Sequence, residues 1–321
     1  MATWLITGGC GFIGSHLADA LEARGDRVRI LDDLSSGRRE NVSATCEVVV
    51  GDVAAPGEVA RLMEGVDGCW HLAAISSVAR SNEAWVATHQ VNQTGTIRVF
   101  EAARHAGAGQ MPVPVVYASS AAVYGNNSGI PLSEHVTPFP FSAYGADKLG
   151  SEHHARVAAL VHGVATTGLR FFNVHGPRQD PASPYSGVIS IFARQILARQ
   201  PVCIHGDGEQ TRDFVFVADV VRFLLQAMVQ TRGAAAYCYN VCTGQAISIR
   251  ALAHLIGRLC GHEPVILSGP GRLGDIRHAL GAPDLAAERL GMRAVWPMER
   301  ALRLTLQGLT DSTLNLARMQ P

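Results

Sequence analysis

The chain has 321 residues, 47% of them hydrophobic, and its 27 basic and 27 acidic side chains leave no net charge when histidine is neutral. A chain of this length buries a substantial core in one large domain or two fused domains, and its balanced charge does not point to nucleic acid or an anionic membrane surface as a partner. No apolar run approaches the roughly 20 residues that a membrane-spanning helix needs.

The N-terminus and the cysteines both favour a cytoplasmic protein. "MATWLITGG" enters an apolar strand at once, without the basic segment or cleavage site of a secretory signal. The seven cysteines are scattered and form no C-x-x-C pair, so we expect reduced thiols. The thirteen histidines show no metal-ligand spacing, and no metal site is predicted.

The first half of the chain alternates short apolar runs with helical patterns. Nearly continuous apolar strands in such an alternation predict a doubly wound α/β fold, with a parallel sheet covered on both faces. The expected strands lie at 3–7, 27–31, 46–50, 68–73, 113–119 and 164–172, and the expected helices lie near 14–24, 57–65, 84–106 and 144–161.

The second half is less regular and begins with a long loop at 173–187. We expect residues 1–172 to form one domain, with a return segment near 214–241, and residues 173–321 to form mainly a second, smaller mixed α/β domain. Its helical patterns lie near 188–199, 218–229, 248–260 and 284–290, and a strand, a turn and another strand are expected over "CIHGDGEQTRDFVF".

A glycine-rich loop, "TGGCGFIG", joins the first expected strand to the first expected helix. Gly8, Gly11 and Gly14 permit a tight turn and the close approach of a pyrophosphate, and the helix N-terminus offers N–H groups to phosphates. Asp32 ends the second strand, where a carboxylate hydrogen-bonds a ribose 2′-OH and repels a 2′-phosphate. The pattern predicts a Rossmann domain that binds NAD rather than NADP.

Two nearby stretches bear on the same cofactor. Arg38 and Arg39 follow Asp32 closely and leave open the binding of a phosphate. "GDV" follows the third strand, which makes Asp52 and the backbone of Val53 candidate contacts for adenine.

A tyrosine and a lysine share one face of the helix that begins near residue 144. "YGADK" spaces Tyr144 and Lys148 by four residues. A lysine cation one turn below a phenol is expected to stabilise the phenolate and lower its pKa. A phenol tuned in this way can exchange a proton with a sugar hydroxyl. Ser120, which follows the fifth expected strand, supplies a third polar group.

These residues and several longer motifs resemble the extended short-chain dehydrogenase/reductase family of nucleotide-sugar enzymes, over essentially the whole chain. The motifs are "TGGCGFIGSHL", "LDDLSSGRREN", "HLAA", "VNQTGT", "SSAAVYG", "YGADK", "RFFNVHGPRQDP" and "GDGEQTRDFVFVADVV". The resemblance implies that Ser120, Tyr144 and Lys148 are catalytic and that Asn92 lies near the active site.

The resemblance also implies the residues that contact NAD. Besides Tyr144 and Lys148, these are Gly8, Gly11, Phe12, Ile13, Gly14, Asp32, Asp33, Ser36, Gly37, Asp52, Val53, Leu72, Ala73 and Ala74.

Two alanines follow the serine pair and narrow the reaction. Sugar-nucleotide 4,6-dehydratases of this family carry an Asp-Glu pair there, and those carboxyl groups supply the acid and the base that eliminate water across C5 and C6 of the sugar. This chain has Ala121 and Ala122 instead, whose side chains cannot transfer a proton. The resemblance therefore implies a 4-epimerase, which oxidises and reduces the sugar at C4 only.

The second domain carries the residues that the family uses to bind a nucleotide diphosphate. The resemblance assigns this role to Asn173, Arg212 and Arg272, and a ribose contact to Asp275. The resemblance also implies that Ala279, four residues after Asp275, lies beside the 2-substituent of the sugar, where a small side chain would leave room for an N-acetyl group.

The resemblance implies an NAD-dependent 4-epimerase of UDP-hexoses, including N-acetylhexosamines. It also implies homodimers that form through the helices near 84–106 and 144–161. Arg80 leaves open a UDP-uronate as the substrate, because it could pair with a C6 carboxylate. A nucleotide-sugar reductase, a decarboxylase and a catalytically silent sugar-nucleotide sensor are further alternatives.

Overall fold

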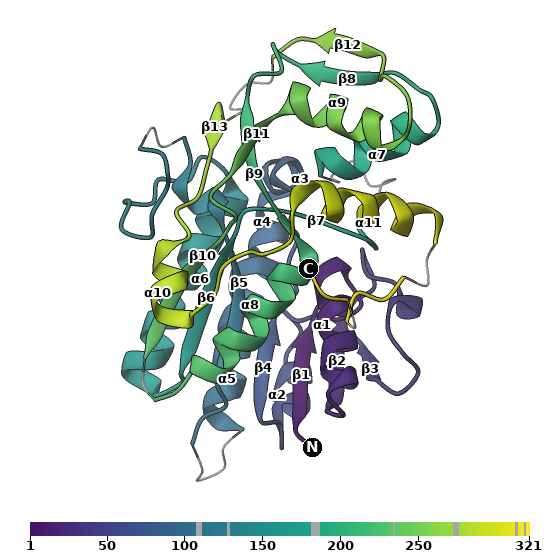
Figure 1. The fold of residues 1–321 in the computed structure, drawn as a ribbon. Helices are drawn as coiled ribbons and strands as arrows, with labels where there is room; N and C mark the ends of the chain where they lie inside the picture. The colour runs from purple at the N-terminus through teal and green to yellow at the C-terminus, as the bar shows by residue number, and fades with distance from the viewer. Residues whose placement is uncertain are drawn as a thin grey trace.

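The computed structural model describes residues 1–106, 111–126, 129–180, 187–233, 235–271, 276–311, 314–317 and 319–321. A seven-stranded parallel sheet with helices on both faces forms the larger part, and a smaller part with shorter strands lies beyond the carboxyl ends of its strands (Figure 1). The predicted doubly wound parallel sheet is confirmed. Among the described residues, no helix is both long enough and apolar enough to span a membrane.

The strand order of the large sheet is β10-β6-β5-β4-β1-β2-β3. The order reverses at β1, because β2 lies on one side of it and β4 on the other, and such a reversal opens a crevice at the carboxyl ends of the strands. The strands are β1 (Thr3–Thr7), β2 (Arg27–Asp32), β3 (Glu47–Val50), β4 (Gly68–His71), β5 (Val115–Ser120), β6 (Thr166–Phe171) and β10 (Ala236–Val241).

Each face of the sheet buries its own apolar cluster. Helices α1 (Phe12–Ala23), α8 (Val217–Gln230) and α10 (Asp284–Leu290) cover one face, where Trp70 and Phe223 are buried. Helices α2 (Glu58–Met63), α5 (Gly95–His105) and α6 (Ala143–His162) cover the other. Burial of strands on both faces accounts for their continuous apolar sequences.

The segment expected to return near 214–241 contributes α8 and β10, and β10 pairs with β6 at the edge of the large sheet. The boundary between the two domains at residue 172 stays a prediction.

The smaller part contains two small sheets packed against three helices (Figure 1). Strand β9 lies between β11 and β13 and also pairs with β7, while β8 pairs with β12. The elements are β7 (Asn173–His175), α7 (Val188–Leu197), β8 (Val202–His205), β9 (Thr211–Phe216), β11 (Ala246–Ser248), α9 (Ile249–Leu259), β12 (Ile266–Gly269), β13 (His278–Ala279) and α11 (Met298–Thr310).

Two regions differ from the expected helices. Instead of one helix over 84–106, the chain forms α4 (Trp85–His89), a π-helical turn η2 (Gln90–Thr94) and then α5. The sequence pattern also missed α3 (Val78–Glu83), the 3₁₀ turns η1 (Arg39–Asn41) and η3 (Ala121–Tyr124), and the long helix α11.

A buried carboxylate holds the segment before α11 against helix α8. Asp219 of α8 is 1% exposed and accepts hydrogen bonds from the backbone N–H groups of Val295 (3.0 Å) and Trp296 (3.1 Å). These bonds satisfy the buried charge and fix the path of the chain into α11.

Candidate active site

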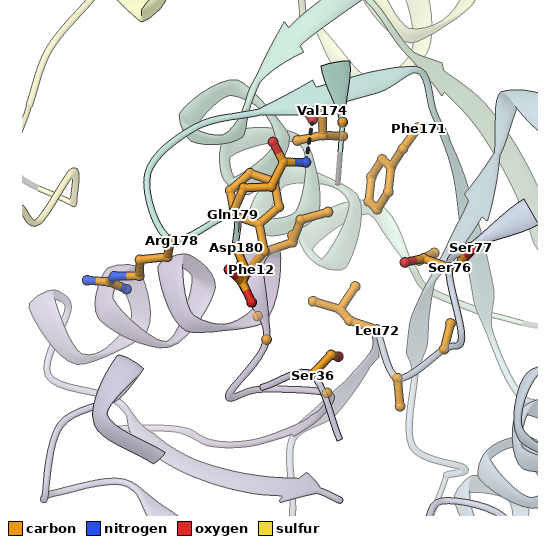
Figure 2. Close-up of a pocket in the computed structure, with 18 of the residues that line it drawn as sticks. Phe12, Ser36, Leu72, Ser76, Ser77, Phe171, Val174, Arg178, Gln179 and Asp180 are labelled. Atoms are coloured by element: carbon orange, nitrogen blue, oxygen red, sulfur yellow. Dashed lines mark hydrogen bonds between the residues drawn. The ribbon is translucent and has the colours of Figure 1, made fainter. Parts of the chain in front are cut away.

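A cavity of about 670 Å³ opens at the carboxyl ends of the large sheet and is lined from both parts of the molecule. Figure 2 shows Phe12, Ser36 and Leu72 from the large sheet side, with Val174 and Gln179 from the segment that follows β6. Most of the residues predicted to bind cofactor line it: Gly8, Gly11, Phe12, Ile13, Gly14, Asp32, Asp33, Ser36, Asp52, Val53, Leu72, Ala73, Ala74, Tyr144 and Lys148.

The glycine loop is packed so tightly that side chains would not fit. A Cβ on Gly8, whose φ is +72°, would lie 2.7 Å from the Ala73 nitrogen, and a Cβ on Gly14 would collide with the Gly8 carbonyl oxygen. Gly11 lies just before α1 and makes no side-chain cap there. The loop therefore leaves a bare cradle and the first N–H groups of a helix, which fit a pyrophosphate.

Asp32 fastens this loop to the end of β2. Its carboxylate is 6% exposed and accepts hydrogen bonds from the backbone N–H groups of Cys10 and Leu34, both at 2.9 Å. Burial raises the pKa of Asp32, and these bonds oppose the rise. Gly37 packs behind the carboxylate, where a Cβ would lie 2.8 Å from Asp32 Oδ1, and it is not among the residues that line the cavity.

The two arginines after Asp32 are engaged with protein groups. Arg39 donates to the carbonyl oxygens of Val42 (3.0 Å) and Ser43 (3.3 Å). Arg38 lines the cavity and forms an ion pair with Asp180 at 3.5 Å. Neither arrangement resembles a preformed site for a 2′-phosphate, which favours NAD.

Ser120, Tyr144 and Lys148 all line this cavity. Ser120 ends β5 and hydrogen-bonds the Tyr144 phenol. Lys148 is 3% exposed, lies 5.8 Å from the centre of the Tyr144 ring, and donates to the Ala118 carbonyl oxygen at 2.8 Å. The helix is held in place by Ser81, whose hydroxyl accepts from the Tyr144 backbone N–H at 3.1 Å.

The charges of this group differ from the sequence prediction. Burial raises the pKa of Tyr144, and the hydrogen bond from Ser120 opposes the rise, so the predicted lowering is wrong in direction. Burial also lowers the pKa of Lys148 from 10.5 to about 8, because the apolar surroundings disfavour an ammonium. For both groups, the pKa shift is caused by loss of contact with water more than by the charge of the other group.

Lys148 is the only lysine in the chain, whose other basic side chains are all arginine. A guanidinium keeps its proton throughout the working pH range, whereas a buried ammonium can lose it. The single lysine of the chain thus places a compact ammonium group beside the phenol of Tyr144.

Asn92 does not line the cavity but supports a segment that does. It is fully buried and bonds both backbone groups of Ile75, accepting from the N–H at 2.8 Å and donating to the carbonyl at 3.0 Å. These bonds fix the segment after β4, which supplies Leu72, Ala73 and Ala74 to the cavity.

The predicted substrate residues are only partly placed at the cavity. Asn173 of β7 lines it and donates to the Asp213 carbonyl oxygen at 3.2 Å. Arg212 and Ala279 lie opposite each other on the paired strands β9 and β13 but are not among the lining residues. Arg272 and Asp275 lie outside the described residues.

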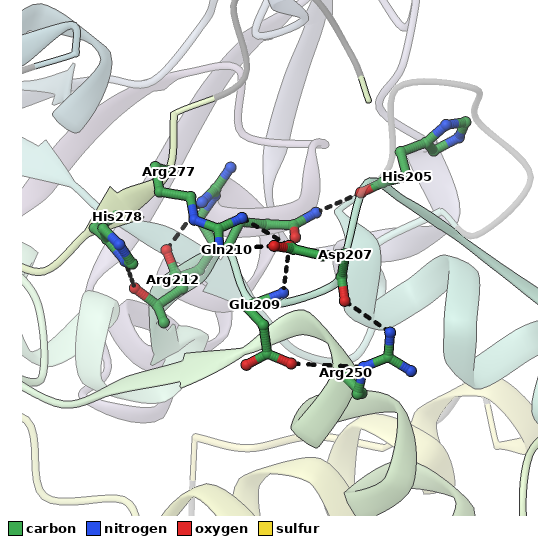
Figure 3. A network of polar contacts seen from close by, with 9 residues as sticks. His205, Asp207, Glu209, Gln210, Arg212, Arg250, Arg277 and His278 are labelled. Carbon is green, nitrogen blue, oxygen red and sulfur yellow. Dashed lines mark hydrogen bonds and ion pairs between the residues drawn. The ribbon is translucent and has the colours of Figure 1, made fainter. Parts of the chain in front are cut away.

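A polar network surrounds Arg212 in the smaller part (Figure 3). Arg277 forms a two-pronged ion pair with Asp207, at 2.7 and 2.8 Å, and Arg250 donates to the Asp207 carbonyl oxygen at 2.7 Å. The network fastens the turn between β8 and β9 to the start of β13.

Sequence reasoning missed the part of the cavity wall formed by residues 174–180 and by the end of α11. Arg178, with φ +65°, forms a 2.7 Å ion pair with Asp19 of α1, and Gly308 packs directly on Pro177. The amphipathic pattern of α11 could have revealed that helix, but no sequence signal placed it at the cavity. Its region contributes Gly308, Leu309, Asp311 and Leu314.

Comparisons with known proteins agree with this geometry. The sequence model of the NAD dependent epimerase/dehydratase family matches residues 4–242. A relative named UDP-glucose 4-epimerase, from Mycolicibacterium smegmatis, is 37% identical over 94% of this chain and 97% of its own length.

Two solved structures are similar over nearly the whole chain. The UDP-glucose 4-epimerase of Thermotoga maritima, solved with UDP-glucose, has a TM-score of 0.90 and 33% identity, covering 96% of this chain and 98% of that one. The UDP-N-acetylglucosamine 4-epimerase of Methanobrevibacter ruminantium, solved with UDP-N-acetylmuramic acid, has a TM-score of 0.89 and 31% identity, with coverages of 96% and 98%.

The single lysine makes its protonation directly measurable. Protein labelled with [6-¹³C]lysine contains one labelled side chain, and we expect its resonance to titrate near pH 8 rather than near 10.5. Because the unfolded lysine keeps its proton up to the higher pH, addition of urea should move the midpoint upward. A midpoint near 10.5 in the folded protein would contradict the desolvation described above.

Proposed function

Because the chain belongs to the NAD dependent epimerase/dehydratase family, we propose that it is an NAD-dependent 4-epimerase of UDP-hexoses. The observation that carries the proposal is the contact between Ser120 and Tyr144 at the cavity. In the sequence, Ser120 is followed by Ala121 and Ala122 of η3. A hydroxyl and a phenol suffice for proton exchange at C4, and the alanines supply no acid or base for elimination at C5 and C6.

The glycine cradle, Asp32 and Lys148 hold the cofactor in this proposal. When bound there, NAD would supply the hydride acceptor for oxidation at C4 and the hydride donor for the reverse step, so it would not be consumed. Gly8, Gly11 and Gly14 bring backbone N–H groups to the pyrophosphate. The Asp32 carboxylate is fixed by backbone donors on the cavity wall, where it binds the adenosine ribose.

Tyr144 moves the proton. Its phenolate takes the proton of the C4 hydroxyl, and Ser120 hydrogen-bonds the reacting oxygen. The Lys148 ammonium, which is 3% exposed and lies 5.8 Å from the centre of the phenol ring, lowers the free energy of the phenolate. After the 4-keto sugar has turned, hydride would return to the opposite face of C4, which inverts that carbon, and the phenol returns its proton to the C4 oxygen.

We propose that the substrates include UDP-N-acetylhexosamines. The support is the structural similarity to a UDP-N-acetylglucosamine 4-epimerase. The small side chain of Ala279 is the sequence argument for this proposal, although Ala279 is not among the residues that line the cavity. Asn173, Arg212, Arg272 and Asp275 bind the nucleotide diphosphate in this proposal.

A UDP-uronate is the second candidate substrate, favoured by Arg80. This arginine lines the cavity, on the helix that is hydrogen-bonded to the backbone of Tyr144. Among the described residues, no hydrogen-bond or ion-pair partner of its guanidinium is present, whereas Arg38 and Arg178 of the same cavity are paired with carboxylates. An unpaired guanidinium suits a carboxylate on the substrate.

We further propose a cytoplasmic homodimer. The seven free cysteines suit a reducing compartment. Helices α4 and α6 expose large apolar side chains, among them Trp85 (65%), Val86 (73%) and Leu160 (72%), which a second copy of the chain would cover.

Replacing Tyr144 by phenylalanine tests the proposed proton transfer. Tyr144→Phe should lower kcat for UDP-galactose and UDP-glucose interconversion by about a thousandfold, because no other group takes the proton. The NAD content of the purified protein should stay unchanged, since the glycine loop and Asp32 remain. Epimerisation at a near wild-type rate would exclude Tyr144 from the reaction.

Comparing kcat/KM for UDP-glucose, UDP-N-acetylglucosamine and UDP-glucuronate identifies the sugar. We expect the first two to be turned over, and Arg80→Met should leave their kcat/KM nearly unchanged. If UDP-glucuronate is the preferred substrate, the same variant should lower its kcat/KM at least about tenfold, the scale of one lost charged hydrogen bond. Turnover of unmodified hexoses alone would refute the proposed acceptance of N-acetylhexosamines.

Light scattering at micromolar concentration should give twice the chain mass of 34.1 kDa. Replacing Leu160 with glutamate should shift the mass toward that of one chain, because a charge would enter the covered face. A monomeric wild type would refute the homodimer.

A further inference from the structure

A buried carboxylate lies behind the catalytic groups and belongs to none of the functions assigned so far. Glu152 follows Lys148 by one helical turn on α6, so Tyr144, Lys148 and Glu152 lie along one side of the helix. Its side chain is 10% exposed, and that of its ion-pair partner, Arg170 of β6, is 7% exposed.

Glu152 joins three elements of the fold. Its Oε1 accepts from the Ser119 hydroxyl at 2.5 Å and from Arg170 Nε at 2.8 Å, and its Oε2 accepts from Arg170 Nη2 at 2.7 Å. Helix α6 is thereby linked to β5 through Ser119 and to β6 through Arg170.

The arginine is held independently of β5. Arg170 Nη1 donates to the Tyr124 hydroxyl at 2.8 Å, and the guanidinium lies 4.9 Å from the centre of that ring. Tyr124 in turn donates to Asn240 Oδ1 at 2.7 Å. Removing the Ser119 hydroxyl would therefore leave the ion pair and its neighbours in place.

Ser119 and Ser120, at the end of β5, form hydrogen bonds with different partners. Ser119 is 1% exposed and turns to α6, on the face of β5 where Val115 and Tyr117 are buried. Ser120 follows it and meets Tyr144. The strand end and the helix are thus connected twice by side chains, once within the catalytic site and once behind it.

We propose that Ser119 and Glu152 are positioning residues, which hold the end of β5 against α6 so that Ser120 and Lys148 stay in register with the Tyr144 phenol. The proposal rests on the 4-epimerase function. Proton transfer needs its heavy atoms within about 2.6–3.2 Å, and a displacement of about 1 Å can cost a hundredfold in rate. Lys148 depends on the same strand, because it donates to the carbonyl of Ala118, the neighbour of Ser119.

The chain supplies a matched control on the same acceptor. Cys238 of β10 donates a weak hydrogen bond to Glu152 Oε1 at 3.4 Å, from a strand that carries no catalytic group. Cys238→Ala removes a contact to the same oxygen without loosening β5. Ser119→Ala removes the contact that the proposal requires.

Steady-state kinetics of the wild type, Ser119→Ala and Cys238→Ala test the proposal. Ser119→Ala should lower kcat about tenfold with KM and NAD content unchanged, and the acidic limb of its kcat profile should move to higher pH as the Ser120 bond to the phenol weakens. Cys238→Ala should stay within about twofold of wild type.

The lysine resonance gives a readout that needs no turnover. In Ser119→Ala labelled with [6-¹³C]lysine, the midpoint should differ from that of the wild type, whereas in Cys238→Ala it should not. A purely structural role of Ser119 predicts lower stability in urea with kcat and the lysine midpoint both unchanged.

The outcomes separate the two proposals. If the wild type is active and Ser119→Ala matches it in kcat and in the lysine midpoint, the positioning role is wrong and the epimerase function stands. An equal loss in both variants also overturns the positioning role. A wild type that epimerises no UDP-sugar overturns the proposed function, and an unchanged lysine midpoint in Ser119→Ala then overturns the positioning role as well.

Discussion

All seven strands of the large sheet run in one direction, and the candidate site depends on that constraint. The carboxyl ends of the strands meet at one edge, so residues far apart in the sequence, such as Gly8, Asp32 and Ser120, converge there. The reversal of strand order at β1 keeps the connecting helices on opposite faces and leaves the edge open between them. Residues 174–180 and the end of α11 then close the opening from the smaller part, which makes a cavity of the crevice.

Exclusion of water sets the chemistry within that cavity. Burial raises the pKa of the Tyr144 phenol and lowers that of the Lys148 ammonium to about 8, so both charged forms are disfavoured before substrate arrives. A lone phenolate or a lone ammonium is costly in such a place, but each stabilises the other. An arginine at position 148 would remain charged regardless of the phenol, which gives a physical reason for a lysine there in a chain that otherwise uses arginine.

Local sequence patterns predicted the fold, because apolar strands, glycines and the acid at the end of β2 determine the structure of the backbone close to them. The parallel sheet, the glycine loop and the meeting of Ser120, Tyr144 and Lys148 follow from such patterns. The wall formed by residues 174–180 and α11 could not be predicted, because it depends on tertiary contacts such as those of Asp219 with Val295 and Trp296. The predicted direction of the Tyr144 pKa shift was wrong for a related reason. The spacing of residues reveals a neighbouring charge, while the depth of burial is known only from the packed structure.

In the proposed mechanism, the two serines at the end of β5 have separate roles: Ser119 supports the strand, and Ser120 takes part in the reaction. A carboxylate near C5 and C6 would permit elimination, and this chain places alanines at 121 and 122. The nearby Glu152 is occupied on both oxygens by Ser119 and Arg170, so its acceptor capacity serves the packing of α6 against the sheet. In the proposed mechanism, that carboxylate is engaged and Ala121 and Ala122 cannot exchange protons, so Tyr144 is the group that carries the proton to and from the sugar. A site with one proton carrier, supported by Ser120 and Lys148, suits a reaction that begins and ends at the same carbon.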